Sequence, residues 1–252
     1  MFLVMRKRTA VAVIASVLVL IAAVALISAG AASEAAATKR LVPVYSVETE
    51  ENKVALTFDA SWGADKTTKI MDILEEYGFK GTFFLTGIWV DEYPELVKEI
   101  NERGHLIGNH SDNHKHLNEL NDTVMSSEID VTADKIEALV GYKPAYYRAP
   151  FGEYDNKLIN ALGARGMQCI QWSADSLDWK GISAAEIAEN VVNKLDKGAI
   201  VLCHNNSEHI TDALPLILLA IKNKGMSAVR LDELVYKDGY TIDASGKQIK
   251  NQ

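Results

Sequence analysis

The sequence predicts an α/β protein built on a mainly parallel β-sheet, because short apolar runs alternate with longer amphipathic segments along most of the chain. Seven runs have the length and composition of buried strands: 54–58, 81–85, 106–109, 145–147, 167–173, 199–203 and 227–230. Six segments between them have helical periodicity: 64–77, 93–103, 123–140, 155–163, 184–195 and 210–224. Glycines such as Gly78 and Gly141 stand where predicted helices end. Periodicity alone leaves open whether the strands form an open sheet or a barrel.

The N-terminal 37 residues differ in kind from the rest. Arg6, Lys7 and Arg8 precede an uncharged apolar run from about Ala10 to Ala32, followed by small residues. This pattern is typical of a secretory signal peptide, and a run of about 20 apolar residues is also long enough for an uncleaved membrane anchor. We therefore expect a leader or anchor with a tether at 1–37, a globular domain at 38–237 and a polar tail at 238–252. The domain is expected to be extracytoplasmic, either secreted or anchored to the membrane through the N-terminal segment.

The charge of the globular part excludes one class of partner. Without its three N-terminal basic residues the chain has 23 Lys and Arg against 34 Asp and Glu, a net charge of −11. Such a surface argues against nucleic acid as a partner. Cys169 and Cys203 lie in apolar runs and are expected to be buried, although two cysteines in an exported protein leave a disulfide open. The sequence leaves the oligomeric state open.

Polar residues gather where the predicted strands end. The run "VALTF" ends at Asp59, "LIGN" leads into 110–114, "AYY" into Arg148, "CIQWS" into 174–179 and "AIVLC" into His204. In a barrel and in an open parallel sheet alike, the carboxyl ends of the strands lie at one edge. Five polar strand ends out of seven indicate a functional site at that edge.

The residue types suggest roles. His110 and His114 are four apart, so one helical turn would bring both imidazoles together as two ligands of a divalent metal; a pair of surface histidines is the alternative. Arg148 needs a carboxylate partner, and Asp59 is the natural candidate. His204 becomes a general acid if Asp175 or Asp178 supports its charge.

The motifs "TFDASWG", "HSDNH", "RAPFG", "DSLDW" and "VLCHN", in this order, resemble the five motifs of the polysaccharide deacetylase family, which is carbohydrate esterase family four with its NodB-homology domain. The "FDxSWG" form of the first motif is similar to sporulation-associated PdaB-type members. The resemblance implies a distorted, incomplete (β/α) barrel of about seven parallel strands. It also implies metal-assisted removal of acetyl groups from N-acetylglucosamine units of peptidoglycan or a chitin-like glycan.

The family's roles carry over onto the matching positions. The resemblance makes Asp59 the catalytic base, Arg148 the residue that orients it, and His204 the general acid with Asp178 and Trp179 beside it. Phe151 supplies a backbone N–H to the oxyanion, Leu202 lines the acetyl pocket, and His110 and His114 bind the metal. The metal is expected to be zinc, with cobalt or manganese as alternatives.

One position departs from the family pattern. Members that hold the metal through two histidines and an aspartate carry a second acid directly after the base, and this chain has Ala60 there. Asp65 is a candidate replacement, so the third protein ligand is left open. Two alternatives to an N-deacetylase therefore remain: a catalytically weak or inactive glycan-binding or assembly module, and an O-acetyl polysaccharide esterase. Acetate release and metal analysis discriminate between them.

Overall fold

The computed structural model describes residues 16–24 and 40–251 of the 252-residue chain. The chain divides into two compact units, Met1–Arg40 and Leu41–Gln252. In the first, residues 16–24 are helical, and most of the predicted leader lies outside the described residues. Among the helices that the structure describes, none combines the length and the apolar character needed to span a membrane.

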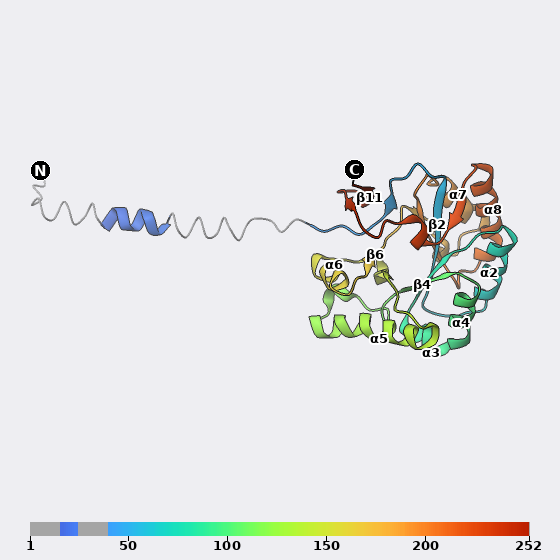
Figure 1. Cartoon of the computed structure of the whole chain (residues 1–252), viewed down its shortest axis with the longest axis horizontal. Helices are drawn as coiled ribbons and strands as arrows, with labels where there is room; N and C mark the ends of the chain where they lie inside the picture. Colours follow the sequence, from blue (N-terminus) through green and yellow to red (C-terminus); the bar gives the residue numbers. More distant parts are fainter. Residues whose placement is uncertain (1–15, 25–39, 252) are drawn as a thin grey trace, which may run out of the picture. The chain divides into compact units, whose positions relative to one another are not determined.

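The larger unit is built on a curved parallel sheet (Figure 1). Its strands are β2 (Lys53–Ala60), β3 (Thr82–Leu85), β4 (Leu106–Asn109), β5 (Tyr146–Tyr147), β6 (Gln168–Cys169), β7 (Ala174–Asp175), β8 (Ile200–His204) and β9 (Ser227–Val229). The order is β6-β5-β4-β3-β2-β8-β7, with β9 also paired to β2, and all of these pairs are parallel. Because β6 and β7 are the two ends of this order, the barrel is incomplete, and the predicted fold class is confirmed.

Helices cover the outside of the sheet (Figure 1). They are α2 (Thr67–Glu76), α3 (Gly87–Glu92), α4 (Pro94–Glu102), α5 (Asp122–Val140), α6 (Asn156–Gly163), α7 (Ala184–Val192) and α8 (Ile210–Asn223). The short helix α9 (Leu231–Leu234) instead packs with Ala55 on the inner side of the sheet. Local signals explain several starts. Asn121 caps α5 through the amide of Val124, and Ser183 forms a capping box with Glu186 at α7. The helix predicted from residue 64 starts at Thr67, because residues 61–66 form the turn that follows β2.

The alternation of side chains along β2 positions the catalytic edge. Leu56 and Phe58 pack into the large core between the sheet and the helices, whereas Ala55 packs into the smaller cluster inside the barrel. Successive side chains of a strand point to opposite faces. Asp59 therefore faces the barrel interior, and Ala60, which is fully buried, belongs to the helix-side core.

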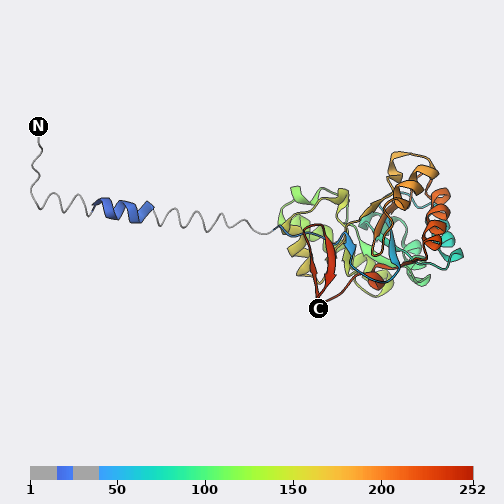
Figure 2. The same cartoon turned by 90° about the horizontal axis from the view of Figure 1, so that it is seen from above.

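Two segments differ in detail from the prediction. The strand predicted at 167–173 is shorter, because only β6 (Gln168–Cys169) pairs within the sheet there. Ile170 pairs with Val44 instead, through hydrogen bonds of Val44 with Cys169 and Gln171, and β7 begins only at Ala174. In the segment predicted as a polar tail, β10 (Tyr240–Ile242) and β11 (Lys247–Lys250) form a small sheet with β1 (Ser46–Val47). β10 and β11 are the red strands of Figure 2. Cys169 and Cys203 are both free and buried.

Candidate active site

Asp59 forms a buried ion pair with Arg148 at the carboxyl end of β2. Asp59 Oδ1 lies 2.8 Å from Arg148 Nη1, and the two side chains are 7% and 0% exposed. Burial raises the pKa of the Asp59 carboxyl, but the neighbouring Arg148, with smaller effects of His110 and His204, outweighs burial and lowers the pKa below its ordinary value. Asp59 is therefore ionised at neutral pH, as a base must be.

Further contacts fix the guanidinium of Arg148. Its Nη1 also donates to Thr57 Oγ1 (2.7 Å), and its Nη2 donates to the carbonyl oxygen of Gln171 (3.1 Å). The ring of Phe84 lies 4.3 Å from the guanidinium carbon. Thr57 and Gln171 were not among the residues predicted from the sequence, which offers no signal for them.

His110 and His114 lie side by side, but on a loop and not on the helical turn that their spacing suggested. Their ring centroids are 4.9 Å apart, and Ser111 and His114 both have left-handed backbone angles (φ 68° and 52°). Such angles are unfavourable for residues other than glycine and tend to occur at functional sites. The prediction of a helix turn was wrong, because i,i+4 spacing reports proximity only when the backbone is helical.

The tautomer and charge of the two histidines suit them to bind a cation. The Nδ1–H of His110 donates to the carbonyl oxygen of Arg148 (2.8 Å), and its Nε2 lies 3.6 Å from Asp59 Oδ2. Burial lowers the pKa of His110, and burial together with the neighbouring His110 lowers the pKa of His114 to about 4. Both imidazoles are neutral at pH 7. His114 Nδ1 is buried without a hydrogen-bond partner.

Glu128 on α5 holds the backbone of this loop. Its Oε2 accepts from the amides of Asp112 (3.1 Å) and Asn113 (2.7 Å), and its Oε1 pairs with Lys115 Nζ (2.7 Å). The Glu128 side chain is 3% exposed. A carboxylate on a predicted helix face gives no sequence signal for this role.

His204 lies opposite Asp59 on the neighbouring strand. The two residues are Cα partners in the β2–β8 pairing, and adjacent strands are about 4.8 Å apart. Asp178 accepts the Nδ1–H (2.7 Å) and the backbone N–H (2.8 Å) of His204, which leaves Nε2 for a substrate. Burial lowers the pKa of His204, but Asp178, with Asp59 and Asp175, outweighs burial, and the pKa is raised. Asp175, the other candidate partner, instead accepts from Trp172 Nε1 (3.1 Å).

A cavity with two overlapping lobes opens above these residues. Both lobes are lined by Asp59, His110, His114, Phe151, Trp179 and His204. One lobe, of about 510 Å³, extends to Ala149, Trp172 and Leu202, and we call it the apolar lobe. The other, of about 490 Å³, extends to Ser61, Trp62, Asn206, Ser207 and Glu208, and we call it the Trp62 lobe.

Every residue predicted for catalysis or for the pocket therefore lies in or beside this cavity. Phe151 follows Pro150 with a left-handed φ of 60°, and Leu202 is 3% exposed at the wall of the apolar lobe. Trp62 and Glu208 were missed by the sequence analysis. The one available signal for Trp62 was a tryptophan in a turn, where large apolar side chains are uncommon.

The residues present fit a metal ion only in part. Within residues 16–24 and 40–251, no group of three His, Cys, Asp or Glu side chains is arranged to hold one. Ala60 lies on the helix side and lines neither lobe, and Asp65 pairs with Lys66 (3.0 Å) at the surface. His110 and His114 thus offer two neutral nitrogen ligands without a third protein ligand.

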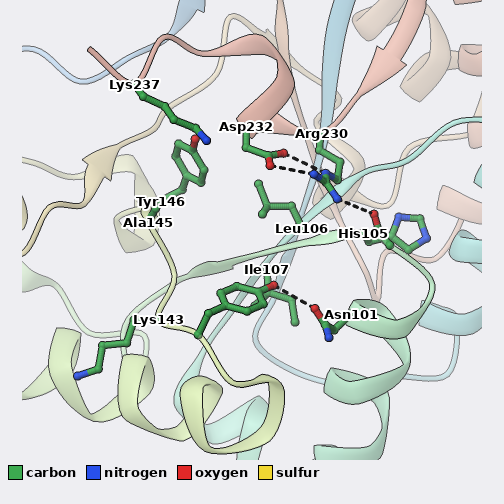
Figure 3. A pocket seen from close by; sticks show the side chains of 12 residues that line it. Asn101, His105, Leu106, Ile107, Lys143, Ala145, Tyr146, Arg230, Asp232 and Lys237 are labelled. Atoms are coloured by element: carbon green, nitrogen blue, oxygen red, sulfur yellow. Dashed lines mark hydrogen bonds and ion pairs between the residues drawn. The ribbon is translucent and has the colours of Figure 1, made fainter.

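A separate cavity of about 350 Å³ lies at the amino-terminal ends of β4 and β5 (Figure 3). Several of its polar groups pair within the protein. Arg230 forms an ion pair with Asp232 (2.9 Å) and donates to the carbonyl oxygen of Gly104, and Tyr142 donates to Asn101. These charges and hydrogen bonds are therefore used within the protein.

The fold and the cavity define an incomplete (β/α) barrel with a hydrolase-type acid–base site at its strand ends. Residues 46–170 match the family model of polysaccharide deacetylases. A peptidoglycan-N-acetylglucosamine deacetylase of Bacillus cereus is 36% identical over 186 residues, covering 72% of this chain and 68% of that protein. The peptidoglycan-N-acetylmuramic acid deacetylase PdaA of Bacillus subtilis is 29% identical over 197 residues, covering 77% and 75%. The chain belongs to the polysaccharide deacetylase family.

The similar solved structures include a pseudoenzyme of carbohydrate esterase family four and a mutant of it with restored enzymatic activity. A mutant of BA3943 from Bacillus anthracis, described as a pseudoenzyme of carbohydrate esterase family four with restored enzymatic activity, superposes with a TM-score of 0.74. It is 30% identical, with 81% of this chain and 72% of that chain covered. Activity in a protein of this fold therefore depends on its own side chains.

Proposed function

We propose that this chain hydrolyses acetamide groups on N-acetylglucosamine units of a cell-wall glycan, peptidoglycan or chitin-like, outside the cytoplasmic membrane. The observation that carries the proposal is the pairing of Asp59 and His204. They are Cα partners on adjacent strands in one cavity, and their surroundings shift their pKa values in opposite directions. One group is ionised and the other tends to be protonated, as a general base and a general acid require.

The reaction follows from these states. Asp59 accepts the proton of a water molecule that attacks the acetamide carbonyl, and Arg148 holds its carboxylate in place. The backbone N–H of Phe151 donates to the oxyanion that forms. His204, supported by Asp178, gives its proton to the departing amine, so that the products are acetate and a free glucosamine unit.

A divalent metal, zinc with cobalt or manganese as alternatives, would be held by His110 and His114. When bound, it would polarise the acetamide carbonyl. The lowered pKa values of the two imidazoles support this role, since a ligating histidine must be neutral. Two ligands imply weak binding, because catalytic zinc sites usually have three protein ligands.

The walls of the cavity support an uncharged acetylated sugar as the reacting unit. Ala149, Trp172 and Leu202 give the apolar lobe a surface suited to an acetyl methyl group. In the described part of the chain, both lobes are lined by carboxylates, including Asp175 and Glu208, and by no lysine or arginine. The lactyl carboxylate of a muramic acid unit would meet like charges there, which favours N-acetylglucosamine.

The test is acetate release by the full chain from chitooligosaccharide and from peptidoglycan, together with metal analysis. Asp59→Asn and His204→Ala are each expected to lower the rate at least about a hundredfold while the circular dichroism spectrum stays unchanged. An unchanged rate in either variant would refute the mechanism. Release from O-acetylated glycan alone would assign an esterase.

A non-catalytic glycan-binding role is the second candidate, favoured by Ala60 and by the known pseudoenzyme. Binding of glycan without acetate release, with or without added zinc, would establish it. The "FDxSWG" motif adds sporulation to the proposal; a gene transcribed only during vegetative growth would contradict that part.

A further inference from the structure

The catalytic cavity is larger than an acetamide group needs, and its exposed side chains are unusual. Among residues 40–251, the large apolar residues that are well exposed are Trp62, Val124, Phe151, Trp179, Leu216 and Leu219. The three aromatic residues of this set all line the cavity. Their exposed fractions are 57% for Trp62, 54% for Phe151 and 62% for Trp179. Apolar rings left open around one cavity indicate a ligand that covers them.

Trp62 differs from the other two because it lines only one lobe. Phe151 and Trp179 border both lobes, where the reacting sugar must lie, whereas Trp62 is found in the Trp62 lobe alone. Its indole packs against His114 in an edge-to-face arrangement, with ring centroids 5.0 Å apart. More than half of the surface of Trp62 nevertheless stays exposed.

The backbone holds this indole rigidly in its exposed position. The carbonyl oxygen of Gly63, the next residue, accepts two hydrogen bonds of 2.8 Å, from Trp89 Nε1 and from Asn205 Nδ2. Gly63 has a left-handed φ of 65°, and Ser61 on the other side is buried. A side chain on such a fixed turn loses little entropy when a ligand covers it.

We propose that the Trp62 lobe binds the sugar unit next to the one that reacts, with the indole stacked on the apolar face of that unit. The flanking Asn206 and Glu208 supply hydrogen-bond partners for its hydroxyl groups. The glycan chain thus leaves the reacting centre past Trp62, while the acetyl group enters the apolar lobe. The lobe makes the protein selective for oligomers over a monosaccharide. This inference rests on the proposed function for the identity of the glycan.

The test compares ligand length. Binding of tetra-N-acetylchitotetraose and of N-acetylglucosamine is measured by titration calorimetry on the full chain carrying Asp59→Asn, so that turnover does not consume the ligand. Adding Trp62→Ala is expected to weaken binding of the tetramer at least about fivefold and to reduce the ratio of the two affinities. Trp62→Phe, which keeps a ring, should restore part of the loss. Leu219→Ala, equally exposed but on α8, is the control and should change neither affinity.

The results separate this inference from the proposed function. An unchanged tetramer affinity in Trp62→Ala, or an equal loss for tetramer and monosaccharide, would overturn the subsite. The wild-type chain could release no acetate from any glycan, while the tetramer still binds more tightly than the monosaccharide and Trp62→Ala reduces that difference. In that case the enzymatic function fails and the Trp62 subsite stands.

Discussion

Arg148 offers the sharpest test of how the catalytic edge is stabilised. The guanidinium is fully buried and is the cation that pairs with the carboxylate of Asp59. Replacing Arg148 by methionine fills much of the space with an apolar side chain but leaves a buried carboxylate without its partner. Breaking a buried ion pair in this way costs about 3–5 kcal/mol. Arg148→Met should lower the free energy of unfolding by that amount at pH 7.

A double-mutant cycle isolates the charge effect. Arg148→Met also removes hydrogen bonds to Thr57 and to the Gln171 carbonyl, and these losses occur whether or not Asp59 is charged. In an Asp59→Asn background, Arg148→Met should therefore cost at least about 2 kcal/mol less than in the wild type. The assay is urea denaturation of all four proteins, followed by circular dichroism.

The dependence on pH has a defined sign. In the wild type the pKa of Asp59 is lowered, so its contribution to stability is present above the ordinary pKa and is lost only as the pH falls through the lowered value. In Arg148→Met, burial without its main compensating charge should raise this pKa above the ordinary value. The gap in stability between the two proteins should then shrink as the pH falls through that raised pKa. Equal costs in both backgrounds, or a gap that is constant from pH 7 to pH 4, would refute the reasoning.

Three further predictions concern residues around the site. Because Asp178 is the main group that raises the pKa of His204, kcat/KM should fall above that raised pKa. Asp178→Asn should move this basic limb of the pH profile down by at least about one pH unit. Asn205→Asp, measured by urea denaturation, should cost about 1–3 kcal/mol, because a carboxylate oxygen would replace the amide that donates to the Gly63 carbonyl. Glu128→Ala should cost about 2–3 kcal/mol in the same assay and lower kcat, because two amides of the histidine loop lose their acceptor.

Matched controls accompany these predictions. Asn206→Asp places the same charge on an exposed neighbour of Asn205, and Glu137→Ala removes an exposed carboxylate from the helix that carries Glu128. Each should change stability by no more than about 0.5 kcal/mol. If the fall of kcat/KM at high pH occurs at the same pH in Asp178→Asn as in the wild type, a group other than His204 is the general acid. Equal losses in a variant and its control would show that the named hydrogen bonds are not the cause.

The sequence by itself determined the alternation of strands and helices and the edge at which polar residues gather. Both depend on local periodicity and on turn residues, which each segment carries within itself. The run that ends at Asp59 and the run that ends at His204 were recognisable as buried strands, and in a parallel sheet their carboxyl ends must share one edge. The motifs then indicated which polar side chains belong together.

The tertiary structure decided what depends on residues distant in the chain. His110 and His114 meet on a loop that contains left-handed residues. Glu128 on α5 accepts hydrogen bonds from two backbone amides of this loop, and no local sequence pattern predicts such a contact. Val44 pairs with Ile170, more than 120 residues further along the chain, just where β6 ends, because the folded barrel brings the two residues together. The exposure of Trp62 and the burial of Ala60 in the helix-side core also depend on tertiary structure. Both are set by side chains from several elements, which pack together only in the folded chain.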